Sequence, residues 1–286
     1  YRWLRGLNEY DSWQASGVSG MGARSFYYPL KSQRCVDCHM PLVDSAEPGN
    51  VNGKVHSHRF PGANTALPTA NQDRKQMDAV TKFLQDKIVS VDIFGISPAR
   101  EAQSAAGTAF SPDIATTFAV GEEGDSGIPA ADAAPAPLTA PLDRVEAVVR
   151  PGETYRVDVV VRTRRIGHFF PGGTVDAFDV WLELIGKDAG GRTIFWSGEA
   201  TDDGRGPVER GAHFYRSYQL DAHGNQIDKR NAWQTRSLLY VRRIPPGAAD
   251  VAHYRVRIPT DVTGPLTFTA RLHYRKFAHA YTQFAY

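Results

Sequence analysis

The pentapeptide Cys35-Val-Asp-Cys38-His39 constrains this chain more than any other feature, because it contains the only two cysteines among 286 residues. Two thiols three positions apart, followed at once by a histidine, form the Cys-x-x-Cys-His pattern of c-type haem attachment. The thiols can reach the two vinyl groups of one porphyrin, and His39 then presents its imidazole to the iron. The alternatives are a thioredoxin-like dithiol, a disulfide or half of a zinc site. No second Cys/His pair at zinc-finger spacing follows, and no βαβ pattern surrounds the motif. The sequence therefore predicts one covalently attached haem c.

The covalent attachment of the haem indicates the compartment in which the protein works. Covalent haem is attached outside the bacterial cytoplasm, so we expect a periplasmic or extracellular protein. The sequence starts without a charged and then apolar leader, and we expect a mature or truncated product. No run of eighteen apolar residues is present, so we expect no membrane span within these residues. The net charge of +2 gives nucleic-acid binding no electrostatic support.

The composition changes sharply along the chain. Residues 1 to about 72 are rich in Tyr, Trp, Gly and Pro and show little periodicity, which is typical of a small region that wraps a haem. A helix is predicted from Asn71 or Asp73 to about residue 88, with one apolar stripe made of Met77, Val80, Leu84 and Ile88. Residues 88–96 (IVSVDIFGI) predict a strand. We assign 1–96 to the haem-binding region and the Ala-, Pro- and Gly-rich residues 97–141 to a surface excursion or linker.

The remaining residues, 142–286, have the pattern of an all-β domain. Apolar residues alternate with polar ones from Tyr155 to Val161, as in a strand with one buried face. Further strand-like runs, separated by glycine- and proline-rich turns, are 177–185, 192–197, 212–220, 236–243, 251–258 and 265–275. The predicted fold class is α+β, mainly β: a small irregular and helical haem region followed by an antiparallel immunoglobulin-like β-sandwich. The strand at 88–96 could join the same sheet, and the sandwich should fold without haem.

The sixth ligand of the iron is predicted from an internal echo. The segments that begin at His58 (HRFPGA) and at His168 (HFFPGG) share the pattern His-x-Phe-Pro-Gly-small. Pro and Gly favour a tight turn, and the aromatic residue would pack beside whatever the imidazole faces. Both histidines are candidates for the distal position, with ordinary exposed turns as the alternative.

Other candidate ligands have weaker support. A methionine ligand would have to be Met21, Met40 or Met77, of which Met21 lies in the most flexible stretch. His56 competes with His58 but lacks the aromatic turn, while His213, His253 and His273 fall inside predicted strands. The loop around His223 spaces Asp221, Asn225 and Asp228 somewhat like calcium ligands, but the favoured interpretation is an ordinary polar hairpin turn.

A family resemblance supports the haem assignment. The run Cys35-Val-Asp-Cys38-His39-Met-Pro41, followed by HSHRFPGANTALP and preceded by EYDSWQASG, resembles the multihaem c-type cytochromes related to pentahaem nitrite reductase and the hydroxylamine-oxidising group. The resemblance covers residues 8 to about 70, and the turn at 167–174 resembles a histidine turn found downstream in some members. It implies that His168 is the sixth ligand of the haem on Cys35 and Cys38, and that His58 ligates a neighbouring haem from elsewhere. This chain departs from the family in carrying one Cys-x-x-Cys-His motif and no lysine-type catalytic haem motif, so the reductase chemistry is not implied.

Three functions remain after these observations. The first is an electron-transfer cytochrome with a bis-histidine low-spin haem, as a subunit or fragment of a multihaem assembly whose partners are other cytochrome or membrane redox subunits. The second is part of a haem oxidoreductase that acts on small nitrogen or sulfur compounds through an open iron. The third is a β-sandwich binding module with an accessory haem. We favour an electron carrier over a catalyst, because no constellation of acids and bases stands out near the motif.

Overall fold

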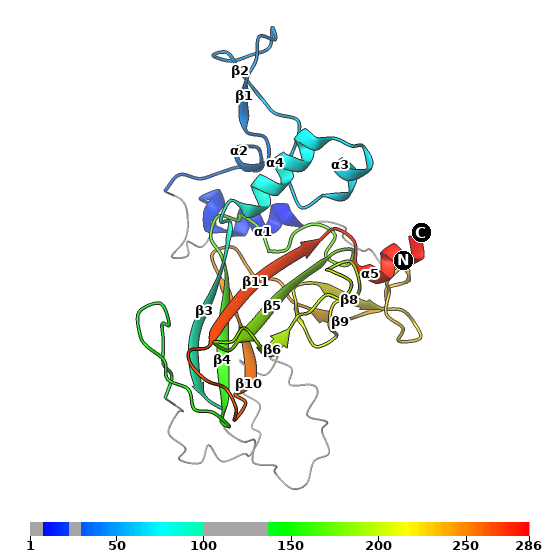
Figure 1. The fold of residues 1–286 in the computed structure, drawn as a ribbon. Coiled ribbons are helices and arrows are strands. Elements are labelled where there is room, and N and C mark those ends of the chain that lie inside the picture. Colours follow the sequence, from blue (N-terminus) through cyan, green and yellow to red (C-terminus); the bar gives the residue numbers. More distant parts are fainter. Residues whose placement is uncertain (1–7, 23–29, 100–136, 286) are drawn as a thin grey trace.

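The computed structural model describes residues 8–22, 30–99 and 137–285, and it is mainly β with antiparallel sheets (Figure 1). Most of the predicted linker at 97–141 therefore lies outside the described residues. One three-stranded sheet has the order β10-β4-β3, formed by β3 (Val89–Pro98), β4 (Thr154–Thr163) and β10 (Ala249–Arg257). The strand expected at 88–96 is β3, and it pairs along its length with β4. A domain boundary at residue 96 would thus separate two hydrogen-bonded strands.

A second sheet carries the strands β5 (Asp179–Lys187), β6 (Thr193–Ser197) and β11 (Thr267–Arg275) in the order β11-β5-β6, and the short β7 (His213–Phe214) also pairs with β5. The two sheets share one hydrophobic core. Its fully buried side chains come from β4, β5 and β10 and from the loops between them, and include Val157, Val159, Leu182, Leu184, Tyr215 and Val256. The alternation that begins at Tyr155 is thereby confirmed for the core face of β4. The opposite face is covered as well, since Val160 and Asp158 are also buried.

The expected strand at 212–220 is two strands. After β7 the chain leaves the second sheet, and β8 (Ser217–Leu220) forms a separate hairpin with β9 (Ser237–Val241). The break falls at Arg216, whose buried guanidinium lies 2.7 Å from the Asp179 carboxylate. A buried charge needs such a partner, so the ion pair fixes the backbone where an uninterrupted strand would have continued.

The N-terminal part is small and partly helical. It contains the following elements: α1 (Glu9–Ala15), the 3-10 turn η1 (Gly17–Ser19), α2 (Cys35–His39), β1 (Leu42–Asp44), β2 (Lys54–His56), α3 (Ala66–Ala70) and α4 (Arg74–Gln85). The helix expected from Asp73 is α4, capped by the Asp73 carboxylate at the Gln76 N–H, with Val80 fully buried. These elements lie together at one end of the two sheets, while α5 (His279–Ala285) closes the described chain (Figure 1). None of the described helices has the length and apolar character needed to cross a bilayer.

Candidate haem site

The short helix α2 places both thiols and the first histidine together. In an α-helix, residues three and four positions apart lie on the same face, so Cys35, Cys38 and His39 point to one side. Asp37 begins this turn: its carboxylate accepts a hydrogen bond from the Arg34 N–H at 2.7 Å, and this contact lowers the pKa of Asp37. Both thiols are free, with Cys35 exposed and Cys38 half-buried. Burial raises the pKa of Cys38 and keeps it in the thiol form.

The imidazole of His39 is held in a defined orientation. Its Nδ1 lies 2.7 Å from the carbonyl oxygen of Pro61. Because a carbonyl can only accept, Nδ1 carries the proton and Nε2 keeps its lone pair, the arrangement that a metal-ligating histidine requires. The ring of Phe60 stacks on His39 at 4.8 Å and 10°, and Phe83 of α4 contacts it at 5.2 Å. His39 can therefore ligate through Nε2 without rearranging its hydrogen bond.

The second imidazole beside it belongs to His168. The two ring centres are 6.3 Å apart and the ring planes differ by only 12°. Nδ1 of His168 lies 2.9 Å from the carbonyl of Phe169, so this ring also keeps Nε2 free. Burial lowers the pKa of His168, which favours the neutral imidazole that binds metals.

The turn that carries His168 is tied to the sheets and to α1. Phe170 exchanges both backbone hydrogen bonds with Ile244, at 2.8 and 2.7 Å. The Arg243 Nε donates to the carbonyl of Pro171 at 3.1 Å, and its guanidinium lies 5.0 Å from the centre of the Phe169 ring. From α1, the carboxylate of Glu9 accepts a hydrogen bond from the N–H of Gly173 at 2.7 Å. Both ends of the Pro-Gly turn are thus fixed by side chains distant in sequence.

Helix α1 connects this turn to the segment that leads into α2. The indole N–H of Trp13 donates to the carbonyl of Gln33 at 2.7 Å, and the N–H of Gln33 donates to Val18 at 2.9 Å. On the other side, a Cβ added at Gly167 would lie 3.1 Å from Trp13 and from Val18. The glycine allows this close approach, and residues 33–39 and 167–174 thereby both contact α1 and the following turn η1.

Gly172 has a comparable role beside the candidate ligand His168. A Cβ at this position would lie 2.8 Å from Cε1 and 2.9 Å from Nδ1 of His168. The glycine therefore gives the imidazole its space. The other glycine of the turn, Gly173, has a left-handed backbone with a φ of 77°, and no atom lies within 4 Å of its hypothetical Cβ.

The first copy of the echoed motif contributes its neighbours instead of its histidine. The side chain of His58 is exposed to solvent. The next residues, Phe60 and Pro61, supply the ring and the carbonyl that hold His39. Phe60 adopts a φ of 43°, a strained value for a bulky residue, and this conformation turns its ring onto the imidazole.

The other candidates take part in local structure. The ring of His56 is bonded to the carbonyl of Met40 at 2.6 Å, and Met21 is 63% exposed. The strand histidines each pair with a carboxylate: His213 with Asp250, His253 with Asp158, and His273 with Glu183.

The possible calcium loop has an ordinary turn geometry. Both Asp221 oxygens accept hydrogen bonds from within the loop, from the N–H groups of His223 and Asn225 and from the Asn225 amide. Across residues 8–22, 30–99 and 137–285, no three His, Cys, Asp or Glu side chains gather into a metal-binding group. The calcium alternative gains no support. A haem iron needs only two protein ligands, because the porphyrin supplies the other four nitrogens.

Five residues that hold the two imidazoles were not predicted from the sequence: Glu9, Phe60, Pro61, Phe83 and Arg243. The echoed motif carries the signal for two of them, since Phe60 and Pro61 belong to its first copy. Glu9 and Arg243 have no local sequence signal, because each contacts a turn that is distant in the chain. Glu9 lies 164 positions from Gly173, and Arg243 lies 72 positions from Pro171.

Comparison with known proteins gives limited information. No family model matches the chain, and no curated protein matches it in sequence. Among solved structures it is similar to a penta-heme cytochrome c552 from Thermochromatium tepidum, with a TM-score of 0.47 and 12% identity over 97% of this chain and 45% of that chain. The chain thus spans less than half the length of that protein. At this identity and TM-score the likeness does not assign the chain to a family.

Proposed function

We propose that this chain is an electron-transfer c-type cytochrome that holds one haem c on Cys35 and Cys38, with His39 and His168 as the two axial ligands. The observation that carries the proposal is the pair of parallel imidazoles, each with Nδ1 engaged by a carbonyl and Nε2 free.

The spacing of the pair is compatible with one iron bound by both Nε2 atoms. A metal bond to an imidazole nitrogen is about 2.0 Å long, and that nitrogen lies about 1.15 Å from the ring centre, so two imidazoles on opposite sides of one ion have centres about 6.3 Å apart. The centres of His39 and His168 are 6.3 Å apart. Direct stacking of two aromatic rings would favour a closer approach, such as the 4.8 Å between His39 and Phe60.

A bound haem would supply reversible one-electron exchange. The chain would contribute the thiols that fix the porphyrin and two imidazoles whose Nδ1 atoms already face carbonyl oxygens. Phe60, Phe83 and Arg243 would keep these imidazoles from moving when the charge of the iron changes. With both histidines bound, a haem would have no coordination position left for a substrate. This supports electron transfer over the alternative of a haem oxidoreductase that acts on small nitrogen or sulfur compounds.

The larger setting is part of the same proposal. The exposed His58 is available to ligate a haem of a neighbouring cytochrome subunit, within a periplasmic or extracellular multihaem assembly. The two sheets, predicted from the sequence to form an immunoglobulin-like β-sandwich, would support the histidine turn at 167–174. The antiparallel sheets and their common core are compatible with such a sandwich.

The decisive experiment exchanges the candidate ligands in protein matured with haem. The intact denatured chain should carry the mass of one haem. His168→Ala should convert the ferric low-spin spectrum to high-spin, and added imidazole should restore it. His58→Ala and the control His223→Ala, an exposed turn histidine, should leave the spectrum unchanged. An unmodified mass, or loss of the low-spin form in His58→Ala instead of His168→Ala, would refute the proposed ligation.

A further inference from the structure

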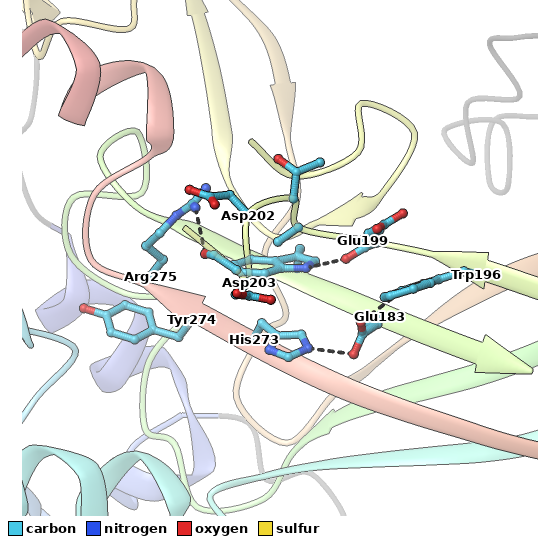
Figure 2. A pocket seen from close by; sticks show the side chains of 13 residues that line it. Glu183, Trp196, Glu199, Asp202, Asp203, His273, Tyr274 and Arg275 are labelled. Carbon is cyan, nitrogen blue, oxygen red and sulfur yellow. Dashed lines mark hydrogen bonds and ion pairs between the residues drawn. The ribbon is translucent and has the colours of Figure 1, made fainter. Parts of the chain in front are cut away.

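The second sheet carries a cleft that the haem site does not use. Its volume is about 740 Å³, within the range of small-molecule sites, and it opens between β5, β6, β11 and the loop at 198–204 (Figure 2). Aromatic side chains form its floor and acidic side chains line its rim. None of the groups that hold His39 or His168 lines this cleft.

The floor is a rigid aromatic stack. Trp181 and His273 face each other across the β5/β11 pair, with ring centres 4.9 Å apart and planes 20° apart. The indole N–H of Trp181 donates to the carbonyl of Gly198 at 2.9 Å, and the guanidinium of Arg275 lies 5.6 Å from its ring centre. The polar atom of Trp181 is therefore already satisfied.

A buried carboxylate orients the second indole. One Glu183 oxygen accepts from the Trp196 N–H at 3.0 Å, and the other accepts from His273 at 3.0 Å and Arg271 at 3.4 Å. Burial opposes ionisation of Glu183, but these hydrogen bonds outweigh it and keep its pKa below the usual value. With its N–H turned inward, Trp196 remains 44% exposed and offers ring surface to the cleft.

The rim adds three carboxylates. Glu199, Asp202 and Asp203 are exposed around the opening (Figure 2). Asp202 forms an ion pair with the exposed Arg205 at 3.9 Å, where both side chains are open to solvent. Arg275 is committed elsewhere, since it holds Asp179 at 2.6 Å and donates to the carbonyls of residues 204–206.

These contacts define what the cleft can still bind. Both indole N–H groups are taken, so the remaining features are an aromatic face and carboxylate acceptors. An aromatic ring next to carboxylates attracts a cation through its quadrupole and through charge. We propose that the cleft binds an ammonium or guanidinium group on an aliphatic chain, with the exposed ring of Trp196 and the carboxylates of Glu199, Asp202 and Asp203 as the lining groups that attract it. Such a group can come from a free amine or from a lysine or arginine side chain of a partner protein.

The test is a titration of the full haem-loaded chain, followed through the indole N–H resonance of Trp196. The probes are 1,5-diaminopentane for a free amine and an acetylated Gly-Lys-Gly amide for a protein side chain, with pentanol and the norleucine peptide as neutral controls. We expect saturable shifts with dissociation constants on the order of 1 mM for the cations and none for the controls. Tighter binding of the diamine would indicate a free amine, and tighter binding of the peptide would indicate a partner side chain.

Rim variants separate the proposal from a nonspecific effect. The combined change Glu199→Gln, Asp202→Asn and Asp203→Asn removes exposed charges without touching the sheet, and should weaken binding by at least about tenfold. Glu47→Gln, at an exposed acid of the β1–β2 hairpin, is the matched control and should bind as the unaltered chain does. Equal binding of neutral compounds, an unchanged affinity in the rim variant or no saturable shift would each overturn the proposal. The readout does not depend on the axial ligands, so its failure is distinct from failure of the proposed function.

Discussion

Replacement of Gly172 by alanine should displace His168, the proposed distal ligand, while leaving the backbone relaxed. The added Cβ would lie 2.8 Å from Cε1 and 2.9 Å from Nδ1 of His168, whereas ordinary carbon contacts begin near 3.5 Å. The imidazole would have to move by about 0.7 Å, which exceeds the tolerance of about 0.5 Å for a functional constellation. Gly172 is not among the glycines with positive φ, so alanine meets no backbone penalty there.

The cost can be expressed as a ligation equilibrium. A side chain pushed off its rotamer by this contact loses about 1 kcal/mol, which shifts the balance between bound and released His168 by about fivefold toward release. In the haem-loaded ferric protein we expect a high-spin fraction in the visible spectrum that rises with temperature. Added imidazole should remove this fraction by filling the vacated position.

Gly173→Ala is the matched control. Its Cβ would meet no atom within 4 Å, but its φ of 77° makes an alanine cost about 1–2 kcal/mol of folding stability. We expect a lower melting temperature and an unaltered low-spin spectrum. The reasoning is refuted if Gly172→Ala keeps a fully low-spin spectrum, or if both variants change it equally.

Three further predictions follow from contacts described above. Glu9→Ala removes the acceptor for the Gly173 N–H, which should destabilise the turn by about 1–2 kcal/mol and speed cyanide binding to the ferric protein in stopped-flow measurements. Glu9→Gln keeps an acceptor and should have a smaller effect. Equal cyanide-binding rates in all three proteins would contradict the role of Glu9. A fragment of residues 88–286 should unfold at a higher urea concentration than one of residues 142–286. The shorter fragment lacks β3, so the edge of β4 is unpaired and the core loses Ile96. Equal unfolding midpoints would contradict a stabilising role of β3. Burial opposes ionisation of Asp250, but the hydrogen bond from His213 outweighs burial and lowers the pKa of Asp250. The ionised carboxylate therefore stabilises the fold fully above the unfolded pKa of about 3.9, and this stabilisation is lost as the pH falls through the lower folded pKa. Asp250→Asn should reduce the loss of stability at acid pH in urea titrations, and an unchanged pH dependence would contradict this.

The local patterns of the sequence predict most of the secondary structure. The helix after Asp73 and the strands near 88, 155, 179, 193, 249 and 267 occur within a few residues of their expected positions, because each is specified by its own hydrophobic period and cap. The split at Arg216 could not be predicted in this way. It depends on an ion pair with Asp179, and a pairing across 37 positions leaves no local trace.

The sequence also predicts part of the candidate haem site. The motif at Cys35 fixes three residues by itself, and the echo points to the turns at His58 and His168. The sequence does not show that one copy of the echo holds His39 through Phe60 and Pro61 while the other presents His168. The two copies have the same local chemistry, and their roles differ because Glu9 of α1 and the pairing of Phe170 with Ile244 fix the position of the second copy.

The two imidazoles lie about 130 residues apart in the chain, and this separation makes the pair a potential cross-link. A bond that closes a loop of that length removes conformational entropy from the unfolded chain, worth about 4–5 kcal/mol by analogy with a disulfide. The thioether bonds on Cys35 and Cys38 would anchor one end permanently, and the bond to His168 would close the other end reversibly. Haem attachment would then cross-link the small N-terminal region to the sheets. After release of His168, that region would be joined to the turn at 167–174 only by weaker contacts such as the hydrogen bonds of Trp13 and Glu9 in α1.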